Sequence, residues 1–266
     1  MKSLTTSKIA IIGAGNLGQA MALGWAHSSH ISPKNITATR RHLSALTELE
    51  EAGIQLSSNN HQAADDADII VVAVKPYKAE EIFAEIAPVV DGKIVISVMT
   101  GVEMSTMQRI LGHSTYVFRA MPNTGTGIAQ SITCVSQAKG QKEGMEQVIE
   151  LFELLGLTTP IEESLMEAAT VLGACGIAYV MRFIRAMVQG GVQIGFDSDT
   201  ANLIATQTVK GAAELLLQGG RHPEEEIDKV TTPKGCTIIG LNEMEHRGFS
   251  SALIRGIVTS YEQIEK

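Results

Sequence analysis

Short apolar runs alternate with helical patterns over the first 160 residues of the chain. Runs rich in β-branched residues predict strands at residues 8–12, 35–39, 69–74 and 93–98, with weaker candidates at 115–118 and 132–135. Helical spacing lies between them, from Leu17 to about Ala26, over Ala79–Ile86 and over 142–155. Strands that alternate with helices in this way are typical of βαβ units, so we expect a mostly parallel, doubly wound sheet.

Beyond Pro160 no clear strand pattern remains. Helices are predicted at residues 162–193, at 198–217 with Asp197 or Ser198 as cap and Gly219-Gly220 as stop, and from about Ser250 onward. The last of these places Leu253, Ile254, Ile257, Val258, Tyr261 and Ile264 on one face. We therefore predict an α/β domain over residues 1–160 and an all-α domain over residues 161–266.

The stretch at residues 168–180 is nearly apolar all round. A helix of this kind needs covering on several sides. The cover is either the ordinary core of the helical domain or a second subunit. The wide apolar faces of the other helices favour an obligate oligomer.

Composition narrows the class of protein. Hydrophobic residues make up 44% and charged residues 19% of the 266 residues, which is typical of a globular chain and excludes a disordered one. The net charge of −8 argues against a dedicated nucleic-acid binder, which needs a basic face. Glycine is frequent at 25 residues and aromatic residues are only 4%, so we expect close backbone approaches and aliphatic packing.

The cysteines and the apolar segments indicate the cellular compartment in which the protein works. Cys134, Cys175 and Cys236 are far apart and lack CxxC spacing, which predicts reduced, buried thiols and neither a disulfide framework nor a metal site. The longest strongly apolar run, at residues 69–74, is far shorter than the ~20 residues of a membrane helix. The short polar start at residues 1–7 does not resemble a signal peptide. The sequence therefore predicts a cytoplasmic protein without membrane or nucleic-acid partners.

A glycine-rich turn follows the first predicted strand and opens the first predicted helix. It consists of Gly13, Ala14, Gly15, Asn16, Leu17 and Gly18 and fits the pattern G-x-G-x-x-G. In such a turn the first glycine makes the bend, the second lets the backbone approach a pyrophosphate, and the third lets helix and strand pack closely. The phosphate then lies against free N–H groups at the helix N-terminus. We therefore predict a dinucleotide-binding site here.

The end of the second predicted strand distinguishes the two nicotinamide dinucleotides. A site that prefers NAD usually has an acidic residue there, which binds the 2′-hydroxyl of the ribose. This chain has Thr39, followed by Arg40 and Arg41. A hydroxyl and two guanidinium groups suit a 2′-phosphate, so we expect NADPH, with NADH as a weaker alternative. A solvated pair of surface arginines is the competing interpretation.

Two further segments lie where the crevice of a doubly wound sheet is expected. Ala73, Val74, Lys75 and Pro76 end the third apolar run, and residues 119–125 follow the run at 115–118. Ligands of such sheets bind beyond the carboxyl ends of the strands. Each segment alone is an ordinary exit from a strand, so only their combination is informative.

Taken in order, the turn GAGNLG at residues 13–18, the exit VAVKP at 72–76 and the loop RAMPNT at 119–124 resemble the pyrroline-5-carboxylate reductases. The second half agrees, with Ala178-Tyr179-Val180, Gly190-Gly191-Val192 and, above all, DKVTTPKGCTI at residues 228–238. That last segment is similar to the family signature D-x-V-x-S/T-P-G-G-x-T-I. The resemblance covers nearly the whole chain, and this segment is its most specific part.

The resemblance implies an N-terminal Rossmann domain followed by a helical domain that interlocks with its partner in a homodimer, with rings of dimers in some members. It also implies reduction of the cyclic imine Δ1-pyrroline-5-carboxylate to L-proline with NAD(P)H, the last step of proline biosynthesis. By position, Thr39, Arg40, Asn60, Ala73, Val74, Lys75, Pro76, Val98, Met99 and Thr100 would join Arg41 and the glycine turn in the cofactor site. Glu163, Val230, Gly235, Cys236 and Thr237 would match the substrate site.

Hydride transfer to a C=N bond needs few acid–base groups from the protein, because the cofactor performs the difficult chemical step. The protein has to hold the ring carbon roughly 3–3.5 Å from the nicotinamide and to bind a carboxylate. Residues 233–237 are predicted as a loop that enters a helix, so free N–H groups can bind that anion. The Thr237 hydroxyl can then hydrogen-bond the ring nitrogen, or it is a helix cap without substrate contact.

The chain departs from the family pattern in two places. Where the family has S-G-S-G-P-A-Y, this chain has GACGIAY at residues 173–179. Ile177 in place of proline restores an N–H, so we expect the helix to run on more smoothly. Lys234 replaces a glycine, and its cation either helps to bind an acid or points to solvent; Lys229 stands where some relatives have a neutral residue. These changes leave the ring size of the substrate open.

Two other functions stay open. One is reduction of another cyclic imine acid, with a six-membered or sulfur-containing ring. The other is a non-catalytic, dinucleotide-binding regulatory protein, for which a hydroxyl at Thr237 has no chemical use. A β-hydroxyacid dehydrogenase is disfavoured, because its catalytic lysine is missing from the long helix predicted at residues 162–193.

Overall fold

The computed structural model describes residues 3–141 and 143–264. The described chain divides into two compact units. The first consists of the residues up to Cys175 together with 261–264, and the second is Gly176–Ser260. The first unit contains the strands, and the second is built from helices.

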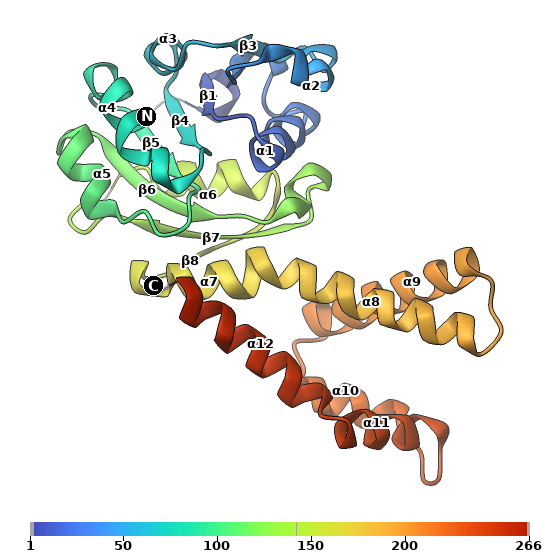
Figure 1. The fold of residues 1–266 in the computed structure, drawn as a ribbon. Helices are drawn as coiled ribbons and strands as arrows, with labels where there is room; N and C mark the ends of the chain where they lie inside the picture. Colours follow the sequence, from blue (N-terminus) through green and yellow to red (C-terminus); the bar gives the residue numbers. More distant parts are fainter. Residues whose placement is uncertain (1–2, 142, 265–266) are drawn as a thin grey trace. The chain divides into compact units, whose positions relative to one another are not determined.

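In the first unit the described strands form one sheet in the order β3-β2-β1-β4-β5-β6-β7-β8 (Figure 1). Their bounds are β1 (Ile9–Ile12), β2 (Ile36–Thr39), β3 (Gln55–Ser57), β4 (Ile69–Val72), β5 (Ile94–Ser97), β6 (Tyr116–Met121), β7 (Ser131–Gln137) and β8 (Gly156–Pro160). Neighbouring strands run parallel except β6 and β7, which are antiparallel. The predicted mostly parallel sheet is confirmed.

Helices cover both faces of this sheet. They are α1 (Asn16–His27), α2 (Thr47–Glu51), α3 (Asn60–Asp66), α4 (Ala79–Ile86), α5 (Met104–Leu111) and α6 (Met145–Glu153). Ile9 and Ile11 pack in the core with α1, α2 and α6, whereas Ala10 and Ile12 pack in the opposite core with α3, α4 and α5. Burial on both faces explains why the central strands are continuous apolar runs.

The sequence pattern missed two strands, and both lie at an edge of the sheet. β3 has the sequence QLS and β8 the sequence GLTTP. An edge strand has a neighbour on one side only, and both of these strands are short and partly polar, so neither makes an apolar run. α2, α3 and α5 were also missed. Of the helix predicted at 142–155, residue 142 lies outside the described residues, and α6 occupies the central part.

The helix predicted at residues 162–193 is not regular. It begins as η7 (Glu163–Leu165) and α7 (Met166–Ala169), turns π-helical over Thr170–Cys175, and continues as α8 (Gly176–Gln193). The expectation of a smoother helix near Ile177 is therefore wrong for the turns just before it. The Asn123 side-chain amide donates to the Gly173 carbonyl at 3.3 Å, and the Thr170 hydroxyl donates to the Met166 carbonyl at 2.9 Å. Such side-chain bonds to helix carbonyls favour a local π-helical turn.

By length and composition, the helix Glu163–Gln193 is long and apolar enough to cross a membrane, and 11% of its most apolar window is buried. Sequence analysis missed this, because no uninterrupted apolar run marks the helix. The core helix of a soluble protein passes the same test when its cover is complete. The function of the protein therefore has to explain what covers the exposed apolar surface of this helix.

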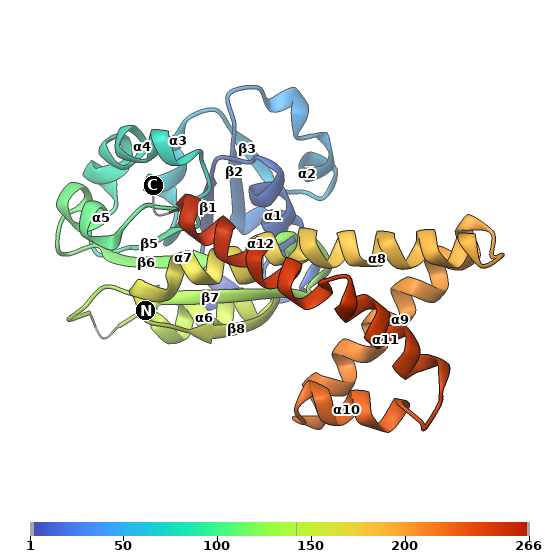
Figure 2. The same cartoon turned by 60° about the horizontal axis from the view of Figure 1, so that its bottom comes forward.

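The second unit contains α8, α9 (Ser198–Gly219), α10 (Pro223–Val230), α11 (Cys236–His246) and most of α12 (Phe249–Ile264). α8 and α9 pack against each other across a tight turn (Figure 2). The Asp197 carboxylate accepts the N–H groups of Asp199 and Thr200, and Gly220 is left-handed at the helix end, as the cap and stop signals predicted.

Replacing Asp197 by alanine is expected to lower the thermal midpoint in a pH-dependent way. Hydrogen bonds from Thr200 and Asp199 hold the pKa of the Asp197 carboxyl below its ordinary value. A depressed pKa means that the carboxylate stabilises the fold above about pH 4, and that this stabilisation is lost as the pH falls through the folded-state pKa. Thermal scans of wild type and Asp197→Ala should differ most at neutral pH and converge on acidification. A constant difference across that range contradicts the expected charge effect.

Candidate functional site

A cavity of about 830 Å³ lies beyond the carboxyl ends of β1 to β5. Its wall contains Gly13, Ala14, Gly15, Asn16, Leu17, Thr39, Arg40, Arg41, Asn60, Ala73, Val74, Lys75, Pro76, Val98, Met99 and Thr100. These are the residues predicted for the cofactor, with Gly18 alone missing from the wall. The carboxyl edge of a doubly wound sheet is where such folds bind ligands. The structure thus brings the predicted residues together around one cavity.

The three glycines of the turn differ in their surroundings. Gly13 has a φ of +100°, and a Cβ there would lie 2.9 Å from the Ala73 carbonyl oxygen. A Cβ at Gly18 would lie 2.5 Å from the Gly13 carbonyl oxygen. Around Gly15 no heavy atom lies within 4 Å of the Cβ position, so this face of the backbone is open to the cavity. The geometry agrees with the bend, packing and close-approach roles predicted for Gly13, Gly18 and Gly15.

Alanine substitutions at Gly15 and Gly18 are expected to separate ligand binding from folding. Gly18→Ala crowds backbone atoms and should destabilise the fold by about 1–3 kcal/mol. Gly15→Ala meets no neighbour, so its thermal midpoint should equal that of wild type, whereas its NADPH affinity should fall about tenfold because the methyl group blocks the pyrophosphate. Thermal scans and fluorescence titration with NADPH measure both effects. If Gly15→Ala bound NADPH as tightly as wild type, the turn would not contact the pyrophosphate.

The hydroxyl of Thr39 fixes the glycine turn from the end of β2. Thr39 is buried, accepts the Gly13 N–H at 3.2 Å, and donates to Asn60 Oδ1 at 2.6 Å. The Asn60 amide donates in turn to Glu85 Oε2 at 3.0 Å. The hydroxyl therefore links the glycine turn to Asn60. That Thr39 also contacts a 2′-phosphate stays a prediction.

Arg40 and Arg41 both line the cavity but are held differently. Arg40 Nη1 donates to the Ala14 carbonyl at 3.2 Å, so part of this guanidinium supports the glycine turn. Arg41 is exposed and makes no hydrogen bond or ion pair to any residue within 3–141 and 143–264. Its five N–H donors remain available for a phosphate group.

Sequence reasoning missed five residues of the cavity wall, namely Ser58, Lys78, Glu81, Ile82 and Glu85. Ser58 follows β3, which is the edge strand that the pattern did not predict. The other four lie three or four residues apart in and just before α4, on one helical face. Projecting the predicted helix Ala79–Ile86 from the exit at Lys75 would have found them.

Comparison with known proteins identifies the two parts of the chain separately. Residues 8–101 match the family model described as NADP oxidoreductase coenzyme F420-dependent, and residues 163–266 match the one described as pyrroline-5-carboxylate reductase dimerisation. Pyrroline-5-carboxylate reductase 2 of Dictyostelium discoideum is 39% identical over 97% of this chain and 92% of its own length. The chain belongs to the pyrroline-5-carboxylate reductase family.

Other members of the reductase family are similar over the whole chain. Pyrroline-5-carboxylate reductase 1 of D. discoideum is 41% identical over 96% of this chain, which spans 49% of that protein's length. The crystal structure of the Plasmodium falciparum pyrroline carboxylate reductase with NADP bound has a TM-score of 0.90 at 25% identity and covers 98% of both chains. The Coxiella burnetii reductase structure has a TM-score of 0.87 at 26% identity. The family predicted from the motifs is confirmed.

The residues that match the substrate site of the reductase family come from both units. Glu163 begins η7 in the first unit, whereas Val230, Gly235, Cys236 and Thr237 lie in the second. Gly235 is the N-cap of α11, and no side chain caps this helix, so the predicted loop entering a helix with free N–H groups is present. Thr237 is exposed in the first turn of α11. That the five residues form one site stays a prediction.

Two backbone positions shape the loop before α11. Lys234 has a φ of +61°, the left-handed region that favours glycine. The glycine of the reductase signature at this place therefore has a conformational reason, and Lys234 adopts the conformation at a cost. A Cβ at Gly235 would lie 2.5 Å from Thr232 Oγ1 and 3.0 Å from the Thr232 carbonyl oxygen, so a larger residue here would crowd the turn.

The three cysteines are free thiols. Cys134 is half-buried, and this burial raises the pKa of its thiol. Cys236 is exposed, so the expectation of buried thiols is wrong at this position, where the open start of α11 leaves the side chain uncovered. Among the described residues, no three His, Cys, Asp or Glu side chains gather in a way that could hold a metal ion.

Proposed function

We propose that this protein reduces Δ1-pyrroline-5-carboxylate to L-proline with NADPH as the hydride donor. The observation that carries the proposal is the full-length similarity to a reductase of that name, 39% identical over 97% of this chain, combined with the cavity that the motif residues line. The NADP-bound Plasmodium structure, with a TM-score of 0.90, supports the choice of cofactor.

The cavity fits a 2′-phosphorylated dinucleotide. No side chain caps α1, so its first N–H groups are available to a pyrophosphate beside the open backbone of Gly15. β2 and β5 lie on opposite sides of β1, so Arg41 at the end of β2 marks the adenosine end and Val98–Thr100 after β5 mark the nicotinamide end. When bound, NADPH supplies the hydride.

Thr237 and the start of α11 are proposed to hold the imine. The uncapped N–H groups of this helix bind the ring carboxylate. The Thr237 hydroxyl hydrogen-bonds the ring nitrogen, which orients the C=N bond and stabilises electron density on nitrogen as the hydride reaches carbon. Glu163, Val230, Gly235 and Cys236 complete the set that the family resemblance implies.

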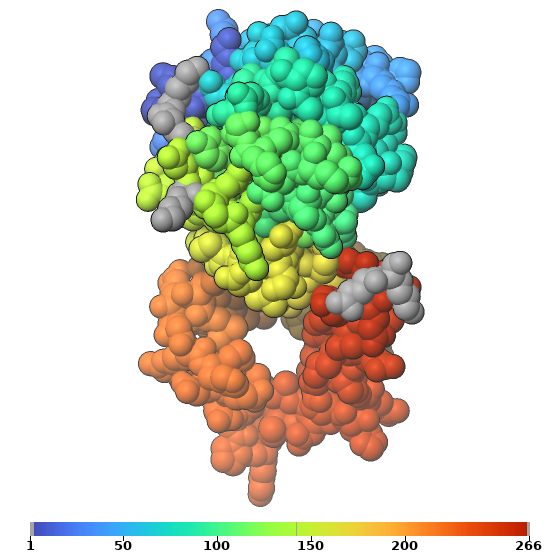
Figure 3. Space-filling view, turned by 90° about the vertical axis from the view of Figure 1, so that its left-hand side faces the viewer, coloured from blue at the N-terminus to red at the C-terminus, as the bar shows by residue number. Residues whose placement is uncertain are grey.

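The second unit buries too few apolar side chains to form a complete core from its own helices. Its buried apolar cluster consists of Val188, Ala201 and Ala205. Large apolar side chains remain exposed, among them Ile194 at 78% and Leu203 at 70%. Figure 3 shows open space between the orange α9 and the red α12. Exposed apolar surface on this scale is typical of a subunit interface. We infer that a second copy of the chain covers these helices. They include α8, which forms the greater part of the apolar helix Glu163–Gln193, so a lipid bilayer is not needed to cover it.

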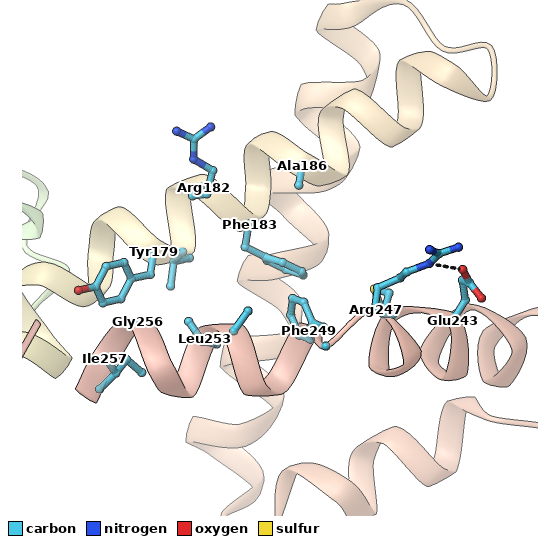
Figure 4. Close-up of a pocket in the computed structure, with 14 residues that line it drawn as sticks. Tyr179, Arg182, Phe183, Ala186, Glu243, Arg247, Phe249, Leu253, Gly256 and Ile257 are labelled. Carbon is cyan, nitrogen blue, oxygen red and sulfur yellow. Dashed lines mark hydrogen bonds and ion pairs between the residues drawn. The ribbon is translucent and has the colours of Figure 1, made fainter. Parts of the chain in front are cut away.

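We locate this interface at a groove of about 740 Å³ between α8 and α12 (Figure 4). The rings of Phe183 and Phe249 meet in it with centroids 6.0 Å apart, and about two fifths of each side chain is exposed, at 38% and 40%. The Tyr179 hydroxyl and Ser260 Oγ are hydrogen-bonded at 2.7 Å, joining α8 to α12. The apolar groove suits a helix of the partner subunit, in keeping with the dimerisation model that matches residues 163–266.

We further propose a Rossmann domain over residues 1–160 and a substrate-binding, dimerising helical domain over 161–266, in a cytoplasmic enzyme. The match of the dimerisation model from residue 163 supports the boundary, and three free cysteines suit a reducing compartment. A ring of dimers stays a prediction.

Ring size tests the proposal, because the segment at residues 173–177 departs from the family pattern. The π-helical turn Thr170–Cys175 overlaps this segment, so its backbone is not regular α-helix over residues 173–175. Initial rates of NADPH oxidation with Δ1-pyrroline-5-carboxylate and with a six-membered cyclic imine acid compare the two. We expect a higher kcat/KM for the five-membered ring. A higher value for the six-membered ring overturns the assignment of substrate but not of reaction type.

A further inference from the structure

A buried arginine in β6 lies between two carboxylates. Arg119 is 3% exposed, its Nη2 is 2.6 Å from Glu167 Oε1, and its Nη1 is 3.6 Å from Glu163 Oε1. All three residues belong to the first unit. The cofactor and substrate chemistry proposed above leaves Arg119 and Glu167 without a role.

The two carboxylates hold the backbone of the segment that follows β5. Glu163 Oε1 accepts the N–H of Met104 at 2.7 Å, and Glu167 Oε1 accepts the N–H of Gly101 at 3.3 Å. Met104 is the first residue of α5, so Glu163 supplies a cap that no residue next to this helix provides. Arg119 itself pairs in register with Ser97, the last residue of β5.

The segment held in this way is the β5–α5 loop, residues 98–103. It contributes Val98, Met99 and Thr100 to the cavity wall, at the end assigned above to the nicotinamide. Gly101 and Met104 therefore bracket the cofactor-facing residues on their far side, and both are anchored to carboxylates that one guanidinium holds together.

Stability alone does not account for this arrangement. Arg119 Nε and Glu167 Oε2 are buried without a hydrogen-bond partner among the described residues. Taking charged groups out of water is costly, and a buried ion pair with unfilled donors and acceptors contributes little net stability. Instead, the cluster fixes the position of the backbone at Gly101 and Met104, whose N–H groups its carboxylates accept.

We propose that Arg119, Glu163 and Glu167 form a clamp that positions the β5–α5 loop against the nicotinamide end of the cofactor. The inference rests on the proposed cofactor site. It makes Arg119 and Glu167 positioning residues, and it gives Glu163 the same task in addition to the place in the substrate site that the family resemblance implies. Misplacement of a positioning loop by about 1 Å can lower a rate by up to about a hundredfold.

The test compares two ligands that differ at one end. NADP⁺ reaches both ends of the cavity, whereas adenosine 2′,5′-bisphosphate occupies only the adenosine end. For Arg119→Met we expect the Kd of NADP⁺ to rise about tenfold and the Kd of adenosine 2′,5′-bisphosphate to stay unchanged, both measured by calorimetry. Glu163→Ala is the second variant, because the Glu163 side chain is 36% exposed and its truncation should leave the fold intact. Arg109→Met is the matched control, because Arg109, which lies on α5, forms an exposed ion pair with Glu80 on the neighbouring α4.

Three outcomes would overturn the clamp. Equal losses for both ligands indicate a structural role for the cluster, and unchanged affinity for both indicates no role in cofactor binding. A rise in the imine KM of Glu163→Ala, with NADP⁺ affinity unchanged, makes Glu163 a substrate residue. Partial recovery of NADP⁺ affinity in Arg119→Lys relative to Arg119→Met supports the clamp. Because the ligands bind without turnover, failure of wild type to reduce the imine would reject the proposed reaction separately.

Discussion

Thr237→Ala is expected to lower kcat/KM for Δ1-pyrroline-5-carboxylate by about a hundredfold. The hydroxyl is proposed to hydrogen-bond the ring nitrogen, and this bond gains strength as electron density builds up on nitrogen during hydride transfer. The loss should therefore fall mainly on kcat. NADPH affinity should not change, because Thr237 lies on α11 and the cofactor cavity is lined by residues of the first unit. Initial rates at saturating NADPH and a separate titration with NADPH measure both quantities.

The matched control is Thr208→Ala, which removes an exposed hydroxyl from α9 in the same unit. Thermal midpoints of both variants should stay close to that of wild type, because neither side chain is buried. A Thr237→Ala variant with unchanged kcat/KM contradicts the proposed role and leaves Thr237 as a residue of the helix start.

Arg41→Ala is expected to lower kcat/KM with NADPH about tenfold to a hundredfold and to leave the value with NADH unchanged. The guanidinium is exposed, lines the cavity and has no partner among the described residues, so its expected use is the 2′-phosphate. NADH lacks that phosphate. Steady-state rates with both cofactors at a fixed imine concentration give the two values.

Arg40→Ala should behave differently, because Arg40 also donates to the Ala14 carbonyl in the glycine turn. We expect losses with both cofactors. Lys34→Ala removes an exposed cation at the opposite end of β2 and serves as the control. Equal losses with NADPH and NADH in Arg41→Ala would show that Arg41 does not select the 2′-phosphate.

The central sheet was predictable because burial on both faces leaves a plain signal. The runs at 69–74 and 93–98 became β4 and β5, each buried at every position. β3 and β8 lie at the edges and bury less, so their sequences carry no such run. The π-helical turn Thr170–Cys175 was not predictable, because it is associated with a bond from Asn123, 50 residues earlier in the chain.

The cofactor cavity was predictable because each of its main walls directly follows a strand. Gly13, Thr39 and Val98 come within one residue of a strand end, where a parallel sheet gathers its loops. The Arg119 clamp was not predictable, since its partners lie 44 and 48 residues away and their approach depends on the pairing of β6 with β5. A buried arginine in the middle of an apolar strand is a sequence signal that such partners exist.

The most direct test supplies the purified protein with NADPH and Δ1-pyrroline-5-carboxylate, follows NADPH oxidation and quantifies proline by chromatography. We expect equimolar L-proline and NADP⁺, with a slower reaction when NADH replaces NADPH. NADPH that remains unoxidised over a range of imine concentrations, or oxidation without proline, would contradict it.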